Sequence, residues 1–393
     1  MEDYSHILTH LGEDRDQVQG AVNPPIYYSS NFAFNTVEEM RHALTHEMDV
    51  PFYTRGHNPT VAVLRKKIAA LEKAEECLLF GSGSAAMAAA VMSQVQQGDH
   101  VICVQKPYSW TGKLLAKLLS RYGVTHTFID GREARNYEAA IQKNTTLLIL
   151  ESPNSMTFEL QDLKAVATIA REHGIRTICD NSYASPINQN PIALGIDIVI
   201  HSATKYLSGH SDVVAGALCT SRDIAEHIFQ SEYMTLGAIL SPHDAWLLLR
   251  GLRTLPLRMQ RVAETTPKIV EYLSTHPLVD KVYYPFLREN EQYELAMQQQ
   301  KMPGGQFSIE LKADSMEQVD LFCNSLQTFL MACSWGGYES LIFPISTLYQ
   351  SANYAETTLP WNFIRFYVGL EDPTYLIADL ENAFQAVSKL PLV

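Results

Sequence analysis

The sequence predicts an α/β fold, with a mostly parallel sheet in a large domain and a smaller α/β domain after it. Short, continuously apolar segments alternate with segments of helical periodicity between about residues 62 and 200. This alternation is typical of a parallel sheet that helices cover on both faces. The chain has 393 residues, too many for one small core, and it becomes helix-rich after about residue 243.

The elements follow from apolar periodicity and from the residues that interrupt it. In the first half we expect strands at 77–80, 100–104, 125–129, 147–150, 175–180 and 196–200, and helices at 63–76, 85–95, 111–122, 137–142 and 162–173. In the second half we expect a helical stretch over 245–273 that breaks near Pro256, strands at 281–284, 306–311 and 363–368, and a last helix over 374–389.

The chain therefore divides into three parts: an N-terminal arm over 1–50, a large domain over 51–242 and a small C-terminal domain over 243–393. The arm is irregular and contains Pro24-Pro25 and several aromatic residues. Its apolar content favours an arm that wraps around a neighbouring subunit.

Composition excludes several classes of function. The formal charge of −13 argues against nucleic acid and anionic membranes as partners. No apolar run reaches membrane-spanning length, and the N-terminus lacks the pattern of a signal peptide. The six scattered cysteines suggest reduced thiols in a cytoplasmic protein, and their spacing predicts no metal site.

The most informative segment is a strand that ends in hydroxyls and one lysine, with Ser202, Thr204 and Lys205 in succession. Apolar surroundings disfavour the charged form of such a lysine, which lowers the pKa of its amine and makes it a nucleophile or base. Asp180 ends another strand, and the ends of parallel strands meet at one edge of the sheet. A lysine, phosphate-binding hydroxyls and an acid for a pyridine nitrogen are the parts of a pyridoxal 5'-phosphate (PLP) site. Taken singly, Lys205 is equally typical of a surface lysine, and Asp180 is equally typical of an aspartate that caps a helix.

Two stretches carry a resemblance to a known family: Asp180 to Pro191, and His201 to Asp212 with the string His-Ser-Ala-Thr-Lys-Tyr-Leu-Ser-Gly-His-Ser-Asp. The chain resembles the Cys/Met-metabolism (transsulfuration) family of PLP enzymes from Tyr53 to about Asp372. The resemblance implies the PLP-dependent transferase fold of the aspartate aminotransferase class, with a mostly parallel seven-stranded sheet. It also implies a homotetramer made of two dimers whose sites are shared between subunits.

The resemblance assigns roles around the cofactor ring. Lys205 would carry PLP covalently and then move protons, and Asp180 would pair with the pyridine nitrogen. Tyr108 would stack on the ring and assist the leaving group, and Asn154 would hydrogen-bond the phenolic oxygen. Outside this context, a tyrosine after a strand is most often a packing residue.

Further residues would bind the phosphate and the substrate. The residues expected to bind the phosphate come from three segments. They are Gly83 and Ser84 at a helix start, Ser202 and Thr204 after a strand, and Tyr53 and Arg55, which would reach in from the neighbouring subunit. Without the resemblance these segments are a turn and a surface loop. Arg365 would bind the carboxylate of a small amino-acid substrate, with Ser334 and Tyr53 beside it.

Three positions bear on the reaction. Phe52 is apolar where cystathionine γ-lyases and γ-synthases commonly carry an acid, and Trp335, in Ser-Trp-Gly-Gly-Tyr-Glu-Ser, resembles bacterial cystathionine β-lyases. Near Tyr108, Trp110 occurs without the cysteine usual in methionine γ-lyases. These positions favour cystathionine β-lyase, a carbon–sulfur lyase that releases homocysteine, pyruvate and ammonia. The alternatives on the same scaffold are cystathionine γ-lyase, cystathionine γ-synthase, methionine γ-lyase and O-acetylhomoserine sulfhydrylase.

Two interpretations from other classes remain open. One is a PLP-binding protein without turnover, against which the complete set of Lys205, Asp180, Tyr108 and Arg365 argues. The other is a dinucleotide-binding dehydrogenase, which needs a G-x-G-x-x-G turn after the first strand. Gly81-Ser-Gly-Ser-Ala-Ala lacks that form.

Overall fold

The computed structural model describes residues 4–349, 351 and 357–388, so Lys389, the last residue of the expected final helix, lies outside the described residues. The chain forms two compact units. Unit 1 comprises Met1–Ser152, Gln161–Ser208 and Asp212–Thr254, and unit 2 comprises Pro153–Leu160, Gly209–Ser211 and Leu255–Val393. The three-part division expected from the sequence stays a prediction.

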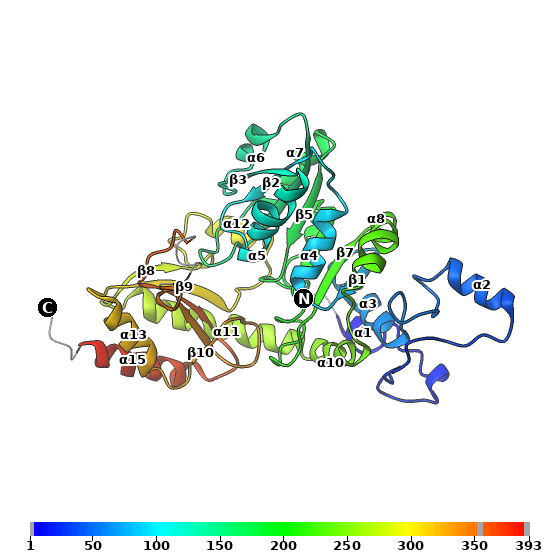
Figure 1. Ribbon diagram of the computed structural model, residues 1–393. Helices are drawn as coiled ribbons and strands as arrows, with labels where there is room; N and C mark the ends of the chain where they lie inside the picture. The colour runs from blue at the N-terminus through cyan, green and yellow to red at the C-terminus, as the bar shows by residue number, and fades with distance from the viewer. Residues whose placement is uncertain (1–3, 350, 352–356, 389–393) are drawn as a thin grey trace. The chain divides into compact units, whose positions relative to one another are not determined.

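Unit 1 is built on a seven-stranded sheet with the order β1-β7-β6-β5-β4-β2-β3 (Figure 1). Its strands are β1 (Glu76–Phe80), β2 (His100–Val104), β3 (Thr125–Ile129), β4 (Thr145–Glu151), β5 (Arg176–Asp180), β6 (Ile198–His201) and β7 (Gly216–Thr220). β7 runs antiparallel to both of its neighbours, and the other pairs are parallel. Every residue of β2 and of β6 is buried, so both faces of the sheet are covered. The predicted mostly parallel α/β sheet is confirmed.

The helices of unit 1 begin and end as local sequence dictates. They are α1 (Ser5–Thr9), α2 (Val37–Thr45), α3 (Pro59–Glu72), α4 (Gly83–Met92), α5 (Ser109–Lys113), α6 (Ala134–Ala140), α7 (Leu163–Glu172), α8 (Arg222–Ile228), α9 (Met234–Leu236) and α10 (Pro242–Leu252). The helix expected to run to residue 76 stops at Glu72, because Lys73 adopts a left-handed conformation (φ 63°) that ends it. The helix expected over 111–122 is α5 followed by a π-helical and a 3₁₀ segment.

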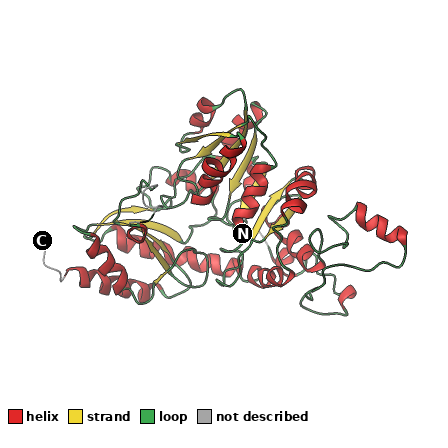
Figure 2. Ribbon diagram, in the orientation of Figure 1, coloured by secondary structure: helices red, strands yellow, loops and turns green. Residues whose placement is uncertain are grey.

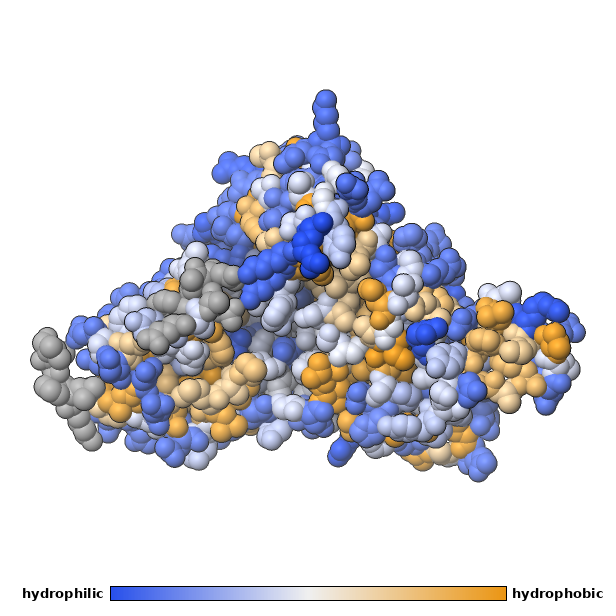
Figure 3. Space-filling view, in the orientation of Figure 1, coloured by the Kyte–Doolittle hydropathy of each residue, from blue (hydrophilic) through white to orange (hydrophobic). Residues whose placement is uncertain are grey.

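The first part of the N-terminal arm packs on its own chain. Lys67 of α3 lies 3.1 Å from the buried carboxylate of Glu13 and donates to the carbonyl oxygens of Ile7 and Leu8. The segment that carries α2 instead stands away from the sheet (Figure 1) and exposes apolar side chains (Figure 3). Val37, Met40 and Leu44 are 73%, 49% and 56% exposed, so α2 presents an uncovered apolar face.

Unit 2 contains a five-stranded sheet with the order β10-β11-β12-β9-β8. Its strands are β8 (Val279–Tyr283), β9 (Gln306–Leu311), β10 (Leu330–Met331), β11 (Leu341–Pro344) and β12 (Phe363–Tyr367), and its helices are α11 (Leu255–Ser274), α12 (Tyr293–Gln299), α13 (Met316–Ser325) and α15 (Pro373–Ser388). Helices α11, α13 and α15 gather on one side of the sheet (Figure 2) over a core in which Phe307 stacks on Phe366 at 5.1 Å. Among the described helices, none is long and apolar enough to cross a membrane.

Candidate cofactor site

The site residues of unit 1 gather where β5 and β6 end. Asp180 is the last residue of β5, and it pairs in register with Ile200 of β6. Ser202 follows β6 directly, and the Lys205 N–H donates to the Ser202 carbonyl oxygen at 3.0 Å in a tight turn. The structure therefore places Asp180, Ser202 and Lys205 at one edge of the sheet. We call them, together with Ser182 and Gly83, the strand-end cluster.

Gly83 allows the start of α4 to approach Ser202 closely. A Cβ atom at Gly83 would lie 2.9 Å from both Cα and Cβ of Ser202, so only glycine fits without a shift. Ser82 caps the helix by accepting from the Ala85 N–H at 3.1 Å. The first N–H groups of a helix have no partner within it and attract anions. Gly83, at the start of α4, and Ser202 thus lie together where an anion is favoured, and Ser84 is exposed on the same helix start. That these three residues bind the phosphate stays a prediction.

Thr204 has a different environment from the one its predicted phosphate role suggests. Its hydroxyl donates to the Ala215 carbonyl oxygen at 3.2 Å and accepts from the Ala215 N–H at 3.0 Å. These bonds tie the turn after β6 to the segment before β7. A role for Thr204 at the phosphate stays a prediction.

The Asp180 carboxylate is fixed by a residue that the sequence analysis missed. Oδ1 of Asp180 accepts from the Ser182 backbone N–H at 2.9 Å and from the Ser182 hydroxyl at 2.6 Å. The same hydroxyl accepts from the Ser202 N–H at 2.6 Å, so Ser182 links the two ends of the strand-end cluster. A hydroxyl two residues after an aspartate is the available sequence signal, since it favours this turn.

Electrostatics tune the same carboxylate. Burial raises the pKa of Asp180 above its ordinary value, while the hydrogen bonds from Ser182 and the charges of His201 and Lys205 lower it. The net direction is upward, because removal from water disfavours the anion. A cation placed against Asp180 would favour its ionised form, which is what a protonated pyridine nitrogen supplies.

Tyr108 is positioned through its backbone. Its N–H donates to Oε2 of Glu151 at 2.6 Å, and Glu151 ends β4. The Tyr108 ring is 43% exposed at the start of α5, so it is accessible for stacking on a ligand. Glu151 is a second positioning residue that sequence reasoning missed.

Three predicted site residues belong to unit 2. Asn154 is buried, and its Oδ1 accepts from the Glu159 N–H at 2.9 Å within one loop. Arg365 on β12 donates to the Ser334 carbonyl oxygen at 2.8 Å, and its guanidinium lies 5.3 Å from the Phe343 ring centre. Burial lowers the pKa of Arg365 to about 10, because removal from water disfavours the charged guanidinium. This arrangement suits the binding of a carboxylate.

Tyr53 and Arg55 lie on the surface of unit 1. Tyr53 is 41% exposed, and the Arg55 guanidinium lies 5.5 Å from the centre of its ring. Phe52 stacks on Phe34 at 6.0 Å. The predicted contact of Tyr53 and Arg55 with the phosphate of a neighbouring subunit stays a prediction.

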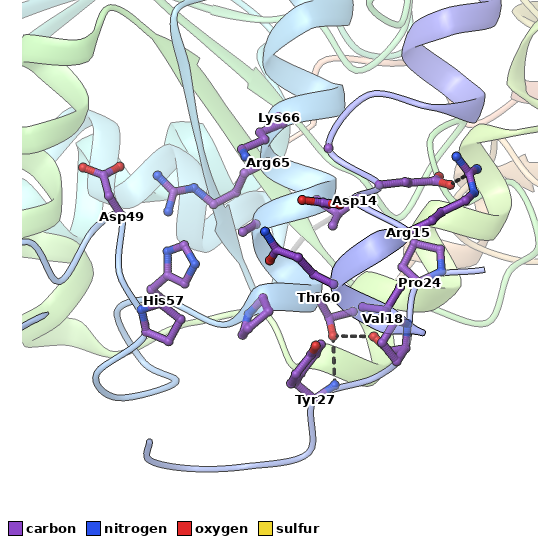
Figure 4. A pocket seen from close by; sticks show the side chains of 18 of the residues that line it. Asp14, Arg15, Val18, Pro24, Tyr27, Asp49, His57, Thr60, Arg65 and Lys66 are labelled. Atoms are coloured by element: carbon purple, nitrogen blue, oxygen red, sulfur yellow. Dashed lines mark hydrogen bonds and ion pairs between the residues drawn. The ribbon is translucent and has the colours of Figure 1, made fainter. Parts of the chain in front are cut away.

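A separate pocket of about 550 Å³ lies between the arm and α3 (Figure 4). Its groups serve the packing of the arm: the Thr60 hydroxyl donates to the Pro25 carbonyl oxygen at 3.0 Å and accepts from the Tyr27 N–H at 2.9 Å. Arg65, in the same wall, donates to the carbonyl oxygens of Cys77 and Met48. The pocket lining also includes Asp14, Lys66 and the start of α3, but it contains none of the residues predicted for the cofactor site, so we place the chemistry at the strand-end cluster.

The residues of unit 1 fit PLP. The start of α4 lies against the Ser202 side chain, where an anion is favoured, and the partly buried Asp180 carboxylate and Lys205 follow the ends of the neighbouring strands β5 and β6. The Cβ that Gly83 lacks would fill part of the space beside Ser202. The fold and these groups define the class of an α/β enzyme that uses pyridoxal phosphate.

Comparison with known proteins identifies the family. The profile of the family described as Cys/Met metabolism PLP-dependent enzyme matches residues 5–385. The chain is 40% identical over 391 residues to L-methionine gamma-lyase of Pseudomonas deceptionensis, and 98% of each chain is covered. It is 37% identical over 375 residues to cystathionine gamma-synthase of Mycobacterium tuberculosis, with 95% of each covered. The chain belongs to the Cys/Met metabolism family of PLP-dependent enzymes.

The solved structures agree. Cystathionine gamma-lyase from Lactobacillus plantarum, complexed with L-serine, superposes with a TM-score of 0.91 at 34% identity, covering 98% of this chain and 100% of that one. The predicted family, fold and cofactor are thus confirmed, and the chain is a PLP-dependent transsulfuration enzyme of a family whose members act on small sulfur amino acids. These relatives are named for reactions at the γ-carbon, so they support the alternatives of the sequence analysis better than its first choice, cystathionine β-lyase.

Proposed function

We propose that the enzyme breaks the bond to the γ-substituent of a sulfur amino acid, with L-methionine or a similar short thioether as substrate. The observation that carries this proposal is the near-full-length similarity to an L-methionine gamma-lyase. Phe52 supports a short substrate, because an apolar side chain, stacked here on Phe34, cannot recognise the distal amino group of cystathionine. The products from methionine would be methanethiol, 2-oxobutyrate and ammonia.

The residues would divide the work as follows. Arg365 binds and orients the substrate carboxylate with its planar fork, and Asp180, held by Ser182, keeps the pyridine nitrogen protonated. Bound PLP supplies an electron sink for the bond electrons released at Cα. The Lys205 amine takes the proton from Cα and then moves a proton at Cβ, a step that only γ-elimination requires. Tyr108 delivers a proton to the departing sulfur.

A second candidate is the β-elimination of cystathionine. It is favoured by Trp335 within Ser-Trp-Gly-Gly-Tyr-Glu-Ser, the string that resembles bacterial cystathionine β-lyases. This reaction needs only the Cα proton to be removed before the thiol leaves Cβ. The same cofactor residues would serve it, so the candidates differ in product and not in the site of unit 1.

Product analysis separates the candidates. The PLP-loaded enzyme is incubated with L-methionine and, separately, with cystathionine, and the keto acid is identified by mass spectrometry. We expect 2-oxobutyrate from methionine. Pyruvate with homocysteine from cystathionine, and no product from methionine, would replace the γ-lyase proposal with the β-lyase. Lys205→Ala is the control, and it should lose both the yellow colour of the bound cofactor and all turnover.

We also infer a homotetramer, built as a dimer of dimers, in which Tyr53 and Arg55 of one subunit complete the phosphate site of another. The exposure of both residues and the uncovered apolar face of α2 support association. Light scattering should give four times the 44.1 kDa chain mass. Inactive Arg55→Ala mixed with inactive Lys205→Ala should regain activity, and a mixture that stays inactive would argue for sites within one chain.

A cytoplasmic location is also part of the proposal. Every cysteine is a free thiol in the structure, and five of the six are buried. Thiols of this kind persist in a reducing compartment.

A further inference from the structure

The sheet of unit 2 has one face that is turned away from its helices, and Arg365 lies on that face. Ile364 and Phe366 of β12 belong to the core that packs under α11, α13 and α15 (Figure 2). Because side chains alternate along a strand, Arg365 and Tyr367 lie together on the opposite face of β12. Tyr367 is only 1% exposed, so this face is covered by another part of the chain.

Two hydrogen bonds fasten the loop between β10 and β11 to this face. Nη2 of Arg365 donates to the Ser334 carbonyl oxygen at 2.8 Å. The Tyr367 hydroxyl donates to the Gly337 carbonyl oxygen, also at 2.8 Å. We call residues 334–339, which include Trp335, the Ser334 loop. Two side chains of one strand, two positions apart, therefore hold this loop.

The Ser334 loop has a conformation that its surroundings must hold. Ser334 is left-handed (φ 75°), which is costly for a residue other than glycine and persists where contacts fix the backbone. At the end of the loop, Oε1 of Glu339 accepts from the hydroxyl of Ser211, which also belongs to unit 2. A Cβ atom at Gly337 would collide with that hydroxyl and lie 2.5 Å from Oε2 of Glu339. The loop therefore has little room to shift.

The bond to the Ser334 loop also restricts Arg365. Within the described residues, the bond to the Ser334 carbonyl oxygen is the only hydrogen bond that the guanidinium makes. A guanidinium has its N–H groups in one plane, so this bond and the nearby Phe343 ring limit its orientation. The remaining N–H groups are left for a carboxylate, which a planar fork matches. A shift of the loop would free the guanidinium to turn.

A second segment with a predicted site residue meets the same face of the sheet. Ser308 of β9 pairs in register with Arg365, and its hydroxyl donates to the Met156 carbonyl oxygen at 2.8 Å. Met156 lies two positions after Asn154, in the loop that unit 2 receives from residues 153–160. This face therefore gathers residues predicted to bind ligands, and Tyr367 is buried among them without a predicted role.

We propose that Tyr367 is a positioning residue for the substrate carboxylate: its hydroxyl holds the Ser334 loop on β12, and the loop holds the Arg365 guanidinium through the Ser334 carbonyl oxygen. The inference rests on the proposed role of Arg365 in binding the carboxylate, and it is independent of whether the β- or the γ-carbon reacts. Tyr367 touches no substrate in this scheme.

The test compares two ligands that differ only in the carboxylate. L-Alanine, which has no leaving group, and ethylamine, which is the same amine without the carboxylate, are titrated separately into the PLP-loaded enzyme. The absorption of the bound cofactor gives each dissociation constant. In Tyr367→Phe we expect the dissociation constant of L-alanine to rise about threefold to tenfold, because one hydrogen bond is lost, while that of ethylamine stays unchanged.

Tyr284→Phe is the matched control. Tyr284 is also 1% exposed in unit 2, and its hydroxyl donates to the Gly304 carbonyl oxygen at 3.0 Å. Both variants lose one buried hydroxyl bond, so their thermal midpoints should fall by similar amounts, but only Tyr367→Phe should weaken L-alanine binding. Gly337→Ala is a second test variant, because it displaces the Ser334 loop while Tyr367 is kept, and it should show the same selective loss.

Several results would overturn the proposal. They are wild-type binding of L-alanine in Tyr367→Phe or in Gly337→Ala, an equal loss in Tyr284→Phe, and a loss that ethylamine shares. Arg365→Lys in the same titration separates the proposal from the assignment on which it rests. If Arg365→Lys weakens L-alanine binding and Tyr367→Phe does not, only the role of Tyr367 fails. If neither variant weakens it, the assignment of Arg365 to the carboxylate fails as well.

Discussion

Removing one hydroxyl from the strand-end cluster should weaken cofactor binding without unfolding the protein. Ser182→Ala deletes the oxygen that donates to Asp180 and accepts from the Ser202 N–H, each at 2.6 Å. The Ser182 backbone N–H, which donates to the same carboxylate oxygen at 2.9 Å, remains in the alanine variant. The carboxylate therefore loses one of its two bonds from Ser182 and keeps the other.

The size of the effect follows from the kind of bond. A hydrogen bond to a charged group contributes about 1.5–3 kcal/mol. Each 1.4 kcal/mol is a factor of about ten in affinity, so we expect the PLP dissociation constant to rise about tenfold to a hundredfold. Loss of the hydroxyl also removes a donor that lowers the pKa of Asp180, so the carboxyl becomes harder to ionise and its pairing with a pyridinium weakens.

Titration of the apoprotein with PLP, followed by absorbance, measures this change. Ser182→Thr keeps the hydroxyl and should bind nearly as well as the wild type. Ser93→Ala is the matched control, since Ser93 is a partly buried serine whose hydroxyl donates to the Ala90 carbonyl oxygen away from the cluster. Wild-type affinity in Ser182→Ala, or equal losses in Ser182→Ala and Ser93→Ala, would refute the link between Ser182 and the cofactor.

Three further outcomes are expected. Gly83→Ala places a Cβ 2.9 Å from Ser202 and should raise the PLP dissociation constant at least about tenfold, whereas Gly112→Ala, whose Cβ would meet only Pro107 at 3.8 Å, should not. Arg365→Lys loses the planar fork and should raise KM for the amino acid about tenfold, with the spectrum of the bound cofactor unchanged; an unchanged KM would contradict its assignment. Burial raises the pKa of Tyr233 to about 12 from 10, so the unfolded chain ionises first and folding loses up to about 3 kcal/mol as the pH rises from 10 to 12. Tyr233→Phe avoids that loss, and its thermal midpoint relative to wild type should be higher at pH 11 than at pH 8; an equal difference at both values would count against it.

The sequence predicts the parallel strands of the fold well, but it misses the antiparallel strand β7 and the end of helix α3. β2, β3 and β9 begin and end at the expected residues, because each is a compact apolar run with clear ends. β7 was not expected, since its place between β1 and β6 depends on pairings with residues more than 15 positions away. The predicted helix extends four residues past the end of α3 for a local reason. Residues 73–76 continue a helical pattern in the sequence, and only the left-handed conformation of Lys73 ends the helix.

The site shows the same division. Asp180, Ser202 and Lys205 are predictable, because strand ends of a parallel sheet meet at one edge. Ser182 has only a short turn signal, because its bonds to Asp180 and to the Ser202 N–H form only when the ends of β5 and β6 are brought together. The residues predicted to touch a ligand lie in recognisable sequence strings, whereas a residue such as Ser182, which bonds to them, is revealed only by the contacts of the folded chain.

The motifs identify the cofactor more firmly than the reaction, because the residues in recognisable strings are those that the cofactor chemistry requires. Elimination at the β-carbon and at the γ-carbon both begin with removal of the Cα proton, so Lys205 and Asp180, in the roles proposed for them, would serve both reactions equally. The difference arises later, from whether a base can also move a proton at Cβ and from what surrounds the distal part of the substrate. Phe52 and Trp335 are the positions from which the sequence analysis argued about the reaction, and they belong to different units. Residues that share one chemical step identify a family, while the choice of bond depends on positions where relatives are free to differ.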